Sequence, residues 1–348
     1  MTSARGDQSA AANAARARGH GQPGVRIAGV GTALPQRVLT NDDLAAIVDT
    51  QDDWITQRTG IKTRHIADNG TTTRSLATEA LRSALDDAGI LAAELDMILL
   101  ATMTPEMSCP STAARVAHEV GATPAGAMDL AAACSGFVYG LNHAAALIQT
   151  GHYRHVAVVG AETLSKITNY DDRRTCILFG DAAGAAILTA DQDPTRGCLA
   201  QTMRSDGSLW GELYVPREER DLPPQHDSFT GKLNTLQMNG QEVFKFAVTT
   251  TQAIIDETLE AAGVGPDQLA AVIPHQSNRR ILELVKKRMD LPDGKMVINI
   301  EKYGNTSAAS VPLCLFEKRH AGELREGDLV LFVAIGGGMC WTTSLWRL

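Results

Sequence analysis

A cysteine stands where an apolar run of the sequence turns into a helix. Cys134 precedes residues 137–148, in which apolar side chains recur at helical spacing on nearly every side, so a buried helix is predicted there. The first turn of a helix presents unpaired N–H groups and the positive end of the helix dipole, and both favour a thiolate. Cys134 is therefore a candidate nucleophile. The alternative is a small buried apolar side chain, as most unpaired cysteines are.

Two polar residues could act with this thiol. His275 directly follows a predicted strand, residues 271–274, and Asn305 stands near the start of a second apolar helix that runs to about Phe316. Ligands gather at the carboxyl ends of strands in α/β sheets, so both positions suit a site. Each signal is weak by itself, because a histidine after a strand is often only structural and an asparagine often only caps a helix.

Three glycines, residues 336–338, follow a predicted buried strand and leave backbone N–H groups open to a substrate oxygen. The N–H groups of Cys134 and Gly337 are expected to form an oxyanion hole. The whole set suits acyl transfer from a thioester through an acyl-cysteine. His275 and Asn305 could both donate hydrogen bonds to a second carbonyl and so stabilise an enolate, which a cysteine hydrolase does not need.

The chain contains a duplication. Gly89 and Gly263 each end an amphipathic helix and are 263 − 89 = 174 positions apart, and strands starting at Val156 and Val330 keep the offset, 330 − 156 = 174. An offset of half the chain indicates two copies of one βα unit, residues 25–195 and 196–348. Cys134 and Asn305, 305 − 134 = 171 positions apart, are expected to be equivalent positions at two helix starts that face one another.

Composition narrows the class of protein. The 348 residues are 44% hydrophobic and 21% charged, as in an ordinary soluble globular protein, and no apolar stretch is long enough to cross a bilayer. The net charge of −8 gives no reason to expect nucleic-acid binding. Six cysteines without a C-x-x-C pair argue against a metal site and for reduced thiols in the cytoplasm. Residues 1–24 carry no secretory signal and are expected to be a disordered tail.

The motifs around the three candidates resemble one enzyme family. Cys134 in Ala-Ala-Ala-Cys-Ser-Gly-Phe, His275 in Pro-His-Gln-Ser-Asn and Asn305 in Tyr-Gly-Asn-Thr-Ser-Ala-Ala-Ser are similar to the triad of β-ketoacyl-acyl carrier protein synthase III. Residues 54–60 and 179–186 also match. The resemblance implies a thiolase-type five-layer αβαβα fold and a homodimer that primes fatty-acid synthesis. Acyl-coenzyme A would load Cys134, and malonyl-acyl carrier protein would then be decarboxylated and condensed, with no other cofactor.

The resemblance also implies binding residues. Trp54 and Arg173 would sandwich the adenine of coenzyme A, with Arg58 nearby and Asn278 beside the pantetheine arm. A local basic cluster would dock the acidic carrier protein, although a solvated helix face explains such a cluster equally well. The cluster comprises Lys245, Arg279, Arg280, Lys286 and Lys287.

Departures from the family pattern leave the choice of primer open. Cys109 stands where the family has a residue bounding the acyl pocket, and Ile335 where many members carry an aromatic residue; the tail of residues 1–24 is also unusual. A starter-unit condensing enzyme or an acyltransferase of polyketide or secondary metabolism is therefore an alternative. A non-catalytic acyl-binding subunit is a remote one, since such a subunit would be expected to have lost one of the three polar residues.

Overall fold

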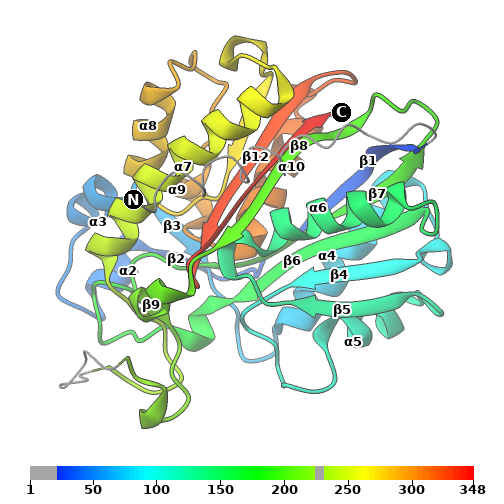
Figure 1. The fold of residues 1–348 in the computed structure, drawn as a ribbon. Helices are drawn as coiled ribbons and strands as arrows, with labels where there is room; N and C mark the ends of the chain where they lie inside the picture. The colour runs from blue at the N-terminus through cyan, green and yellow to red at the C-terminus, as the bar shows by residue number, and fades with distance from the viewer. Residues whose placement is uncertain (1–21, 224–230) are drawn as a thin grey trace, which may run out of the picture.

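Two β-sheets form the framework of the computed structural model, which describes residues 22–223 and 231–348 (Figure 1). The predicted tail therefore lies outside the described residues except for its last three positions. The first sheet has the strand order β1 (Gly24–Ala33), β7 (Asp181–Asp191), β6 (His155–Thr163), β4 (Met97–Ala101) and β5 (Gly126–Leu130). The second has the order β11 (Ala271–Pro274), β12 (Leu329–Gly336), β13 (Cys340–Arg347) and β8 (Gly197–Ser205).

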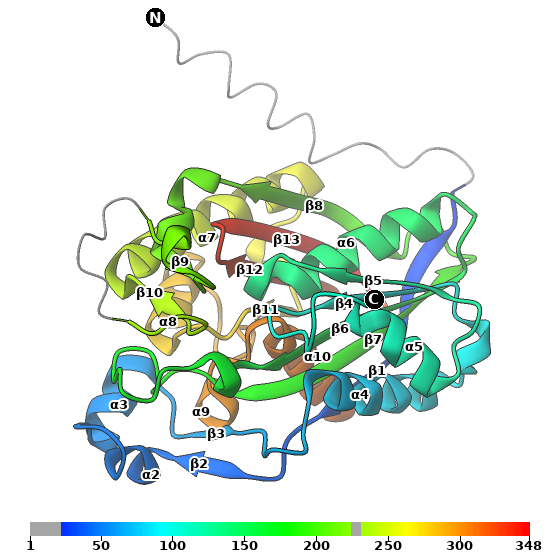
Figure 2. The ribbon, with the colours of Figure 1, turned by 90° about the horizontal axis from the view of Figure 1, so that it is seen from below.

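Helices cover both sheets and fill the space between them (Figures 1 and 2). The outer layers are α4 (Thr73–Ala88) with α5 (Thr112–Val120), and α7 (Gly240–Ala262) with α8 (Arg279–Arg288). The middle layer is α6 (Gly136–Gln149) with α10 (Ser310–His320). Phe137, Leu141 and Ile148 of α6 are fully buried because sheets lie on both sides of this layer. The five-layer αβαβα prediction is confirmed.

The duplication extends to the backbone. α4 and α7 both end at a left-handed glycine, Gly89 and Gly263, each with φ of 63°. Ala133 and Ser307 are non-glycine residues with positive φ, 46° and 49°, and are also 307 − 133 = 174 positions apart. The predicted boundary after residue 195 falls between β7 and β8.

The repeat corrects one expectation. At an offset of 174, Cys134 is equivalent to position 134 + 174 = 308, an alanine, and not to Asn305. The helix predicted near Asn305 begins at Ser310 instead, because a turn of 3₁₀ helix, η7 (Ser307–Ala309), comes first. The matching turn before α6 is η2 (Ala133–Ser135).

Smaller elements gather at one end of the two sheets. Arg64 of β3 connects some of them: its fully buried guanidinium donates to Oδ1 of Asn41 at 2.8 Å and to the carbonyl of Ile177 at 2.6 Å. Asn41 in turn donates to Asp52, in the first turn of α3, at 2.7 Å. These elements are β2 (Val38–Thr40), α2 (Asn41–Ala45), α3 (Asp52–Thr59), β3 (Thr63–His65), β9 (Leu213–Tyr214), β10 (Gln237–Met238) and α9 (Ile300–Tyr303). The remaining 3₁₀ turns are η1 (Ala92–Glu94), η3 (Leu164–Ile167), η4 (Gly207–Glu212), η5 (Glu219–Asp221) and η6 (Pro266–Gln268).

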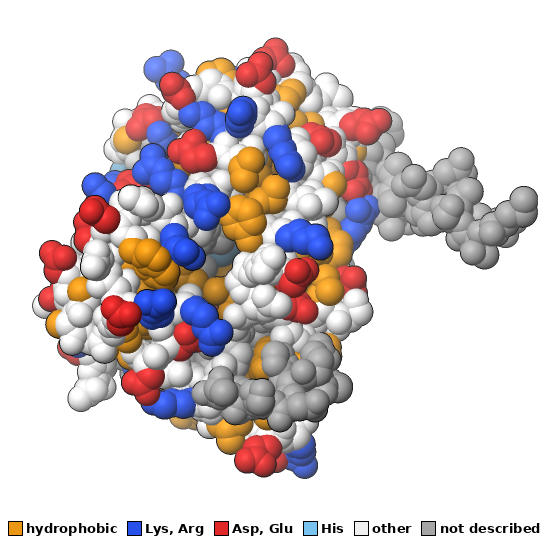
Figure 3. Space-filling view, turned by 90° about the vertical axis from the view of Figure 1, so that its left-hand side faces the viewer, with side chains coloured by type: hydrophobic (Ala, Val, Ile, Leu, Met, Phe, Trp, Pro, Cys, Tyr) orange, Lys and Arg blue, Asp and Glu red, His pale blue; other side chains and the backbone are white. Residues whose placement is uncertain are grey.

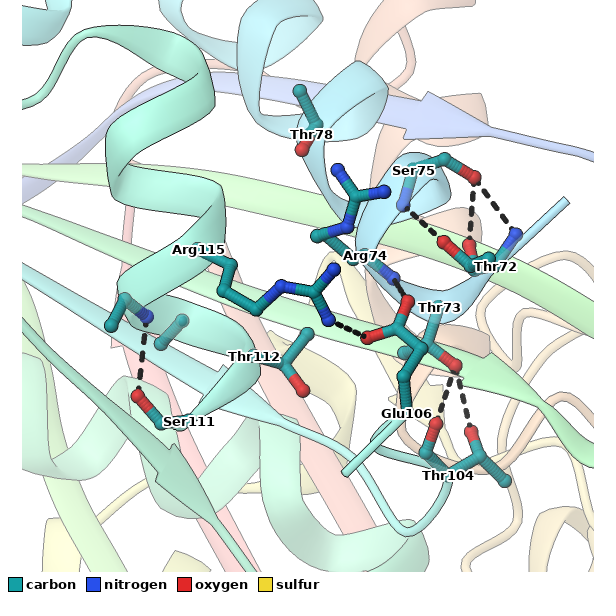
Figure 4. Close-up of polar contacts among 12 residues, drawn as sticks. Thr72, Thr73, Arg74, Ser75, Thr78, Thr104, Glu106, Ser111, Thr112 and Arg115 are labelled. Atoms are coloured by element: carbon teal, nitrogen blue, oxygen red, sulfur yellow. Dashed lines mark hydrogen bonds and ion pairs between the residues drawn. The ribbon is translucent and has the colours of Figure 1, made fainter. Parts of the chain in front are cut away.

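The loop after β4 is tied to the starts of α4 and α5 (Figure 4). Glu106 accepts a hydrogen bond from the backbone N–H of Arg74 at 2.9 Å and pairs with Arg115 at 3.2 Å. The hydroxyl of Thr73 donates to the carbonyl of Thr104 at 2.7 Å. These contacts hold in place a loop that also carries Met103, which lines the cavity described next.

Candidate active site

Cys134, His275 and Asn305 line one cavity of about 110 Å³. All three are buried, with exposed fractions of 8%, 6% and 7%. The structure thus brings together the three residues that the sequence singled out, from both halves of the chain. The rest of the lining is mostly apolar and includes Met103, Leu164, Leu178, Phe179, Leu213, Phe244, Ile335 and Met339.

Cys134 lies in η2, directly before α6. The end of β12 passes so close to this turn that a Cβ atom on Gly336 would lie 2.8 Å from the backbone nitrogen of Cys134. Only glycine permits that approach. Gly336 lines the cavity; Gly337, the predicted oxyanion donor, comes one residue later and packs against Leu213.

Burial controls the charge of Cys134. Desolvation raises the pKa of its thiol to about 12 and outweighs a hydrogen bond with Ser307, which lowers the pKa. The sequence predicted the opposite shift, because a helix start favours a thiolate. The loss of water around the buried sulfur is the larger effect, so the resting residue is a thiol.

His275 is held from two sides. Its backbone N–H donates to the carbonyl of Val333 at 2.7 Å, and its Nδ1 lies 2.7 Å from the hydroxyl of Ser310. Burial lowers the pKa of the imidazole to about 4, although the backbone of Ser307 opposes the shift. His275 is therefore neutral near pH 7.

The carboxamide of Asn305 has a defined orientation. Its Oδ1 accepts the backbone N–H of Ser307 at 2.9 Å, and its own backbone N–H donates to the carbonyl of Leu178 at 2.8 Å. Within the described residues, its Nδ2 has no hydrogen-bond partner. Asn305 therefore offers the cavity a donor that needs no change of protonation state.

Glu162 is a buried carboxyl group next to the cavity that sequence reasoning missed. It accepts hydrogen bonds from the hydroxyls of Ser307 at 3.0 Å and Thr104 at 2.8 Å, and from the backbone N–H of Met103 at 3.0 Å. Burial raises its pKa to about 7. The one signal in the sequence is an acidic residue near the end of strand β6, directly after the apolar run 156–161.

The predicted nucleotide-binding residues meet at α3. The guanidinium of Arg58 lies 4.6 Å and that of Arg173 5.6 Å from the centre of the Trp54 ring. Asn278 connects this group to the cavity, since it lines the cavity and its Nδ2 donates to the carbonyl of Arg58 at 3.0 Å. The same side chain caps α8 through Arg280.

The two predicted acyl-pocket residues lie apart. Ile335 lines the cavity, whereas Cys109 is exposed in the loop before α5 and is not part of the lining. The structure therefore does not bring Cys109 into the cavity of its own chain.

The predicted basic cluster lies on α7 and α8, on a face where Lys and Arg side chains gather around hydrophobic ones (Figure 3). Arg279, Arg280 and Lys287 line a hollow of about 430 Å³ beside α3. Several of the charges have partners: Lys286 pairs with Asp293, Arg279 with Glu283 and Lys245 with Glu242. In the described part of the chain no cluster of metal-ligating side chains occurs, and no helix there is long and apolar enough to cross a membrane.

Two duplicated halves that share a central helix layer, with a buried cysteine at the start of one central helix, define a protein of the thiolase fold. Within that class, the chain belongs to the 3-oxoacyl-[acyl-carrier-protein] synthase III family. The family's model matches residues 128–207, and the model of its C-terminal part matches residues 259–348.

Individual relatives support the same family assignment. A beta-ketoacyl-[acyl-carrier-protein] synthase III from Caldanaerobacter subterraneus subsp. tengcongensis is 48% identical over 319 residues, 92% of this chain and 96% of the relative. The crystal structure of 3-oxoacyl-[acyl-carrier-protein] synthase III from Aquifex aeolicus is 43% identical, with a TM-score of 0.87 over 93% of this chain and all of that one. The priming β-ketosynthase of the R1128 polyketide pathway is 34% identical, with a TM-score of 0.86 over 94% of this chain and 97% of that one.

Proposed function

We propose that this protein catalyses a decarboxylative Claisen condensation that starts fatty-acid synthesis. An acyl-coenzyme A primer loads Cys134, and malonyl-acyl carrier protein then gives β-ketoacyl-acyl carrier protein, carbon dioxide and free Cys134. One observation carries the proposal: a buried thiol shares an apolar cavity with Asn305, whose carboxamide is turned so that its Nδ2 is free to donate.

In the loading step the sulfur of Cys134 attacks the thioester carbonyl. Coenzyme A leaves, and the acyl group stays on the cysteine. The backbone N–H groups of Cys134 and of Gly337 are the proposed donors to the oxyanion, and each such donor contributes about 3 to 4 kcal/mol in characterised enzymes. The apolar lining excludes water, which favours transfer to carbon over hydrolysis.

In the condensing step the malonyl group loses carbon dioxide and becomes an enolate. Asn305 and His275 are the proposed partners of its oxygen. The carbanion then attacks the acyl-cysteine and releases Cys134. An enzyme that only transferred acyl groups would have no use for a second pair of groups aimed at a carbonyl.

The substrates are proposed to arrive over the face that carries α3 and α8. Trp54, Arg58 and Arg173 offer a ring and two cations to the nucleotide of coenzyme A, and Asn278 lies between them and the cavity. The basic cluster on α7 and α8 suits an acidic carrier protein. No further cofactor enters this mechanism, and scattered cysteines fit a reducing cytoplasm.

A homodimer is also part of the proposal. β5 is one of the two edge strands of the first sheet and stays partly exposed, with Met128 40% exposed. Unpaired edge strands are normally covered. A second copy seated at this edge would lie close to α5, which packs against β5, and Cys109 is exposed in the loop that precedes α5.

The test is intact-protein mass spectrometry of the wild type and Cys134→Ala with a panel of acyl-coenzyme A thioesters, followed by a malonyl-acyl carrier protein chase. An adduct on the wild type alone, discharged with release of carbon dioxide, is expected and identifies the primer. An adduct that survives the chase would point to an acyltransferase. No adduct with any thioester would refute the nucleophile and favour a non-catalytic acyl-binding subunit.

A starter-unit condensing enzyme of a polyketide pathway is the second candidate. The similarity to the R1128 priming β-ketosynthase supports it, as does Ile335, which lines the cavity at a predicted pocket position. It shares the chemistry and differs in the primer and the carrier protein. Parallel chases with carrier proteins of fatty-acid and polyketide type would separate the two candidates.

A further inference from the structure

His275 and Ser310 are joined by a hydrogen bond whose direction the surrounding groups determine. Nδ1 of His275 and Oγ of Ser310 are 2.7 Å apart. Either atom could be the donor if the pair were alone. The serine hydroxyl has a single proton, so the question is where that proton points.

The other neighbours of Ser310 determine where its hydroxyl proton points. Its Oγ lies 2.8 Å from the carbonyl oxygen of Ser307, which can only accept, and 3.3 Å from the backbone N–H of Gln276, which can only donate. If the hydroxyl proton pointed at His275, the two oxygens would face each other at 2.8 Å without a hydrogen between them. The proton therefore points at Ser307, and Ser310 accepts from His275.

We propose that Ser310 holds His275 as the Nδ1–H tautomer, so that its unprotonated Nε2 serves the cavity as a proton acceptor. Nε2 has no hydrogen-bond partner among the residues that the structure describes, and His275 lines the same cavity as Cys134. The expectation that neutral His275 donates to a carbonyl is thereby reversed. Asn305 donates from the outset, whereas His275 donates only after it has gained a proton.

The proton has an identified source within the proposed function, on which this inference rests. Cys134 is a thiol before loading, and its S–H bond must break as the new C–S bond forms. Nε2 of His275 takes that proton and passes it to the departing thiolate as the C–S bond to coenzyme A breaks, because the buried imidazole does not hold a proton near pH 7 by itself. In the second half a proton enters from solvent. The negative charge of the forming enolate favours the imidazolium, which donates to the enolate oxygen, and its proton passes to Cys134 when condensation releases the thiolate. The protons balance, since the condensation consumes one.

Ser310 is thus a positioning residue that acts through His275. Among the described residues Ser310 is the only side-chain partner of Nδ1, so replacing it by alanine leaves the tautomer free to change. We expect acylation of Cys134 to slow at least about tenfold, part of the roughly 10²- to 10⁴-fold that a positioned acid–base group contributes. Ser310→Thr keeps the hydroxyl and is expected to retain the tautomer.

The direct test is ¹⁵N NMR of the imidazole nitrogens in the full-length protein, with uniformly labelled histidine near pH 7. The signals of His275, one of nine histidines, are assigned by their absence in His275→Asn. The wild type and Ser310→Thr should show a protonated Nδ1 and an unprotonated Nε2, and Ser310→Ala should lose this pattern. A protonated Nε2 in the wild type, or an unchanged pattern with full acylation rate in Ser310→Ala, would overturn the proposal.

Ser344→Ala is the matched control. Ser344 is a fully buried serine that donates to Asn142 and accepts from Trp346, and it touches none of these groups. It should lose stability and leave the signals of His275 unchanged. The tautomer can be measured without any substrate, so a failure of the proposed function would not be mistaken for a failure of this inference.

Discussion

The hydroxyl of Ser307 donates to Oε1 of Glu162 at 3.0 Å, and the bond joins η7 of the second half to β6 of the first. Ser307 has a φ of 49°, which L-residues adopt at a cost. Its backbone N–H orients Asn305 and its carbonyl accepts from Ser310. Glu162 thus holds Ser307 in place, and the backbone of Ser307 hydrogen-bonds to both Asn305 and Ser310.

Glu162 should make the stability of the protein depend on pH. Its pKa is raised from 4.5 to about 7 in the folded protein, so its contribution is fully present below pH 4.5 and is lost as the pH rises through 7. The loss amounts to about 3 kcal/mol. Glu162→Gln has no proton to lose, so the stability of this variant relative to the wild type should increase over that range. Urea unfolding at fixed protein concentration, in half-unit steps of pH, measures it.

The wild type alone would hide this effect. The pKa of His275 is lowered from 6.5 to about 4, so its contribution is present above pH 6.5 and is lost as the pH falls through 4. The two contributions oppose each other between pH 4.5 and 6.5. Subtracting the stability curve of His275→Asn from that of the wild type isolates the contribution of His275. A constant difference between Glu162→Gln and the wild type across this range would show that the carboxyl group is not buried as described.

Asn305→Ala should separate the two half-reactions. Its Nδ2 is proposed to contact only the enolate, so acylation of Cys134 should stay within a few-fold of the wild type while discharge by malonyl-acyl carrier protein slows about 10²- to 10³-fold. Rapid-quench mass spectrometry follows both steps on one sample. His275→Ala is the comparison and should slow both. Equal slowing of the two steps by Asn305→Ala would place the amide in the loading step as well.

Trp54→Ala should weaken binding of coenzyme A thioesters without slowing the chemistry. The ring and the two guanidinium groups over it are expected to contribute about 1 to 2 kcal/mol to binding, so KM should rise about tenfold at constant kcat. Acyl-pantetheine, which lacks the nucleotide, is the matched control substrate and should show no change. An equal rise in KM for both substrates would indicate that α3 had shifted.

Arg280→Glu and Lys287→Glu should raise KM for malonyl-acyl carrier protein several-fold and leave KM for the acyl-coenzyme A primer within about twofold. Both side chains line the hollow beside α3, and reversing their charge would repel an acidic partner. The effect should shrink as salt is added. Arg82→Glu, on α4 in the opposite outer layer, is the matched charge reversal. If all three variants behave alike, net charge is responsible and the cluster is a solvated helix face.

The sequence could predict the three polar residues of the site because each stands at one end of an apolar segment of recognisable period: Cys134 and Asn305 before one, His275 after one. The apolar side chains of α6 and β11 predict by themselves that both elements are buried. The residues at the ends of these elements were therefore expected in the interior of the protein. The 174-residue offset likewise depends only on residue spacing. Two duplicated βα halves that share one central layer of helices give the five layers of the fold.

The remaining features depend on contacts between distant segments. The charge state of Cys134 is decided by how completely both halves exclude water from it, and a local pattern reports only the helix start. Glu162 becomes part of the site through Ser307, which is 145 positions away. A 3₁₀ turn lies between Asn305 and the start of α10, so the position equivalent to Cys134 comes three residues after Asn305, and no residue type marks that turn.

A nucleophile kept as a buried thiol is also a chemically durable one. Peroxide and simple alkylating reagents attack thiolates that they can reach, and Cys134 offers neither the charge nor the access between turnovers. In the proposed function, Cys134 becomes reactive when an acyl thioester enters the cavity and His275 removes its proton. Selectivity among electrophiles therefore resides in the shape of the cavity, and covalent inhibitors of this protein would have to resemble an acyl chain before they could react.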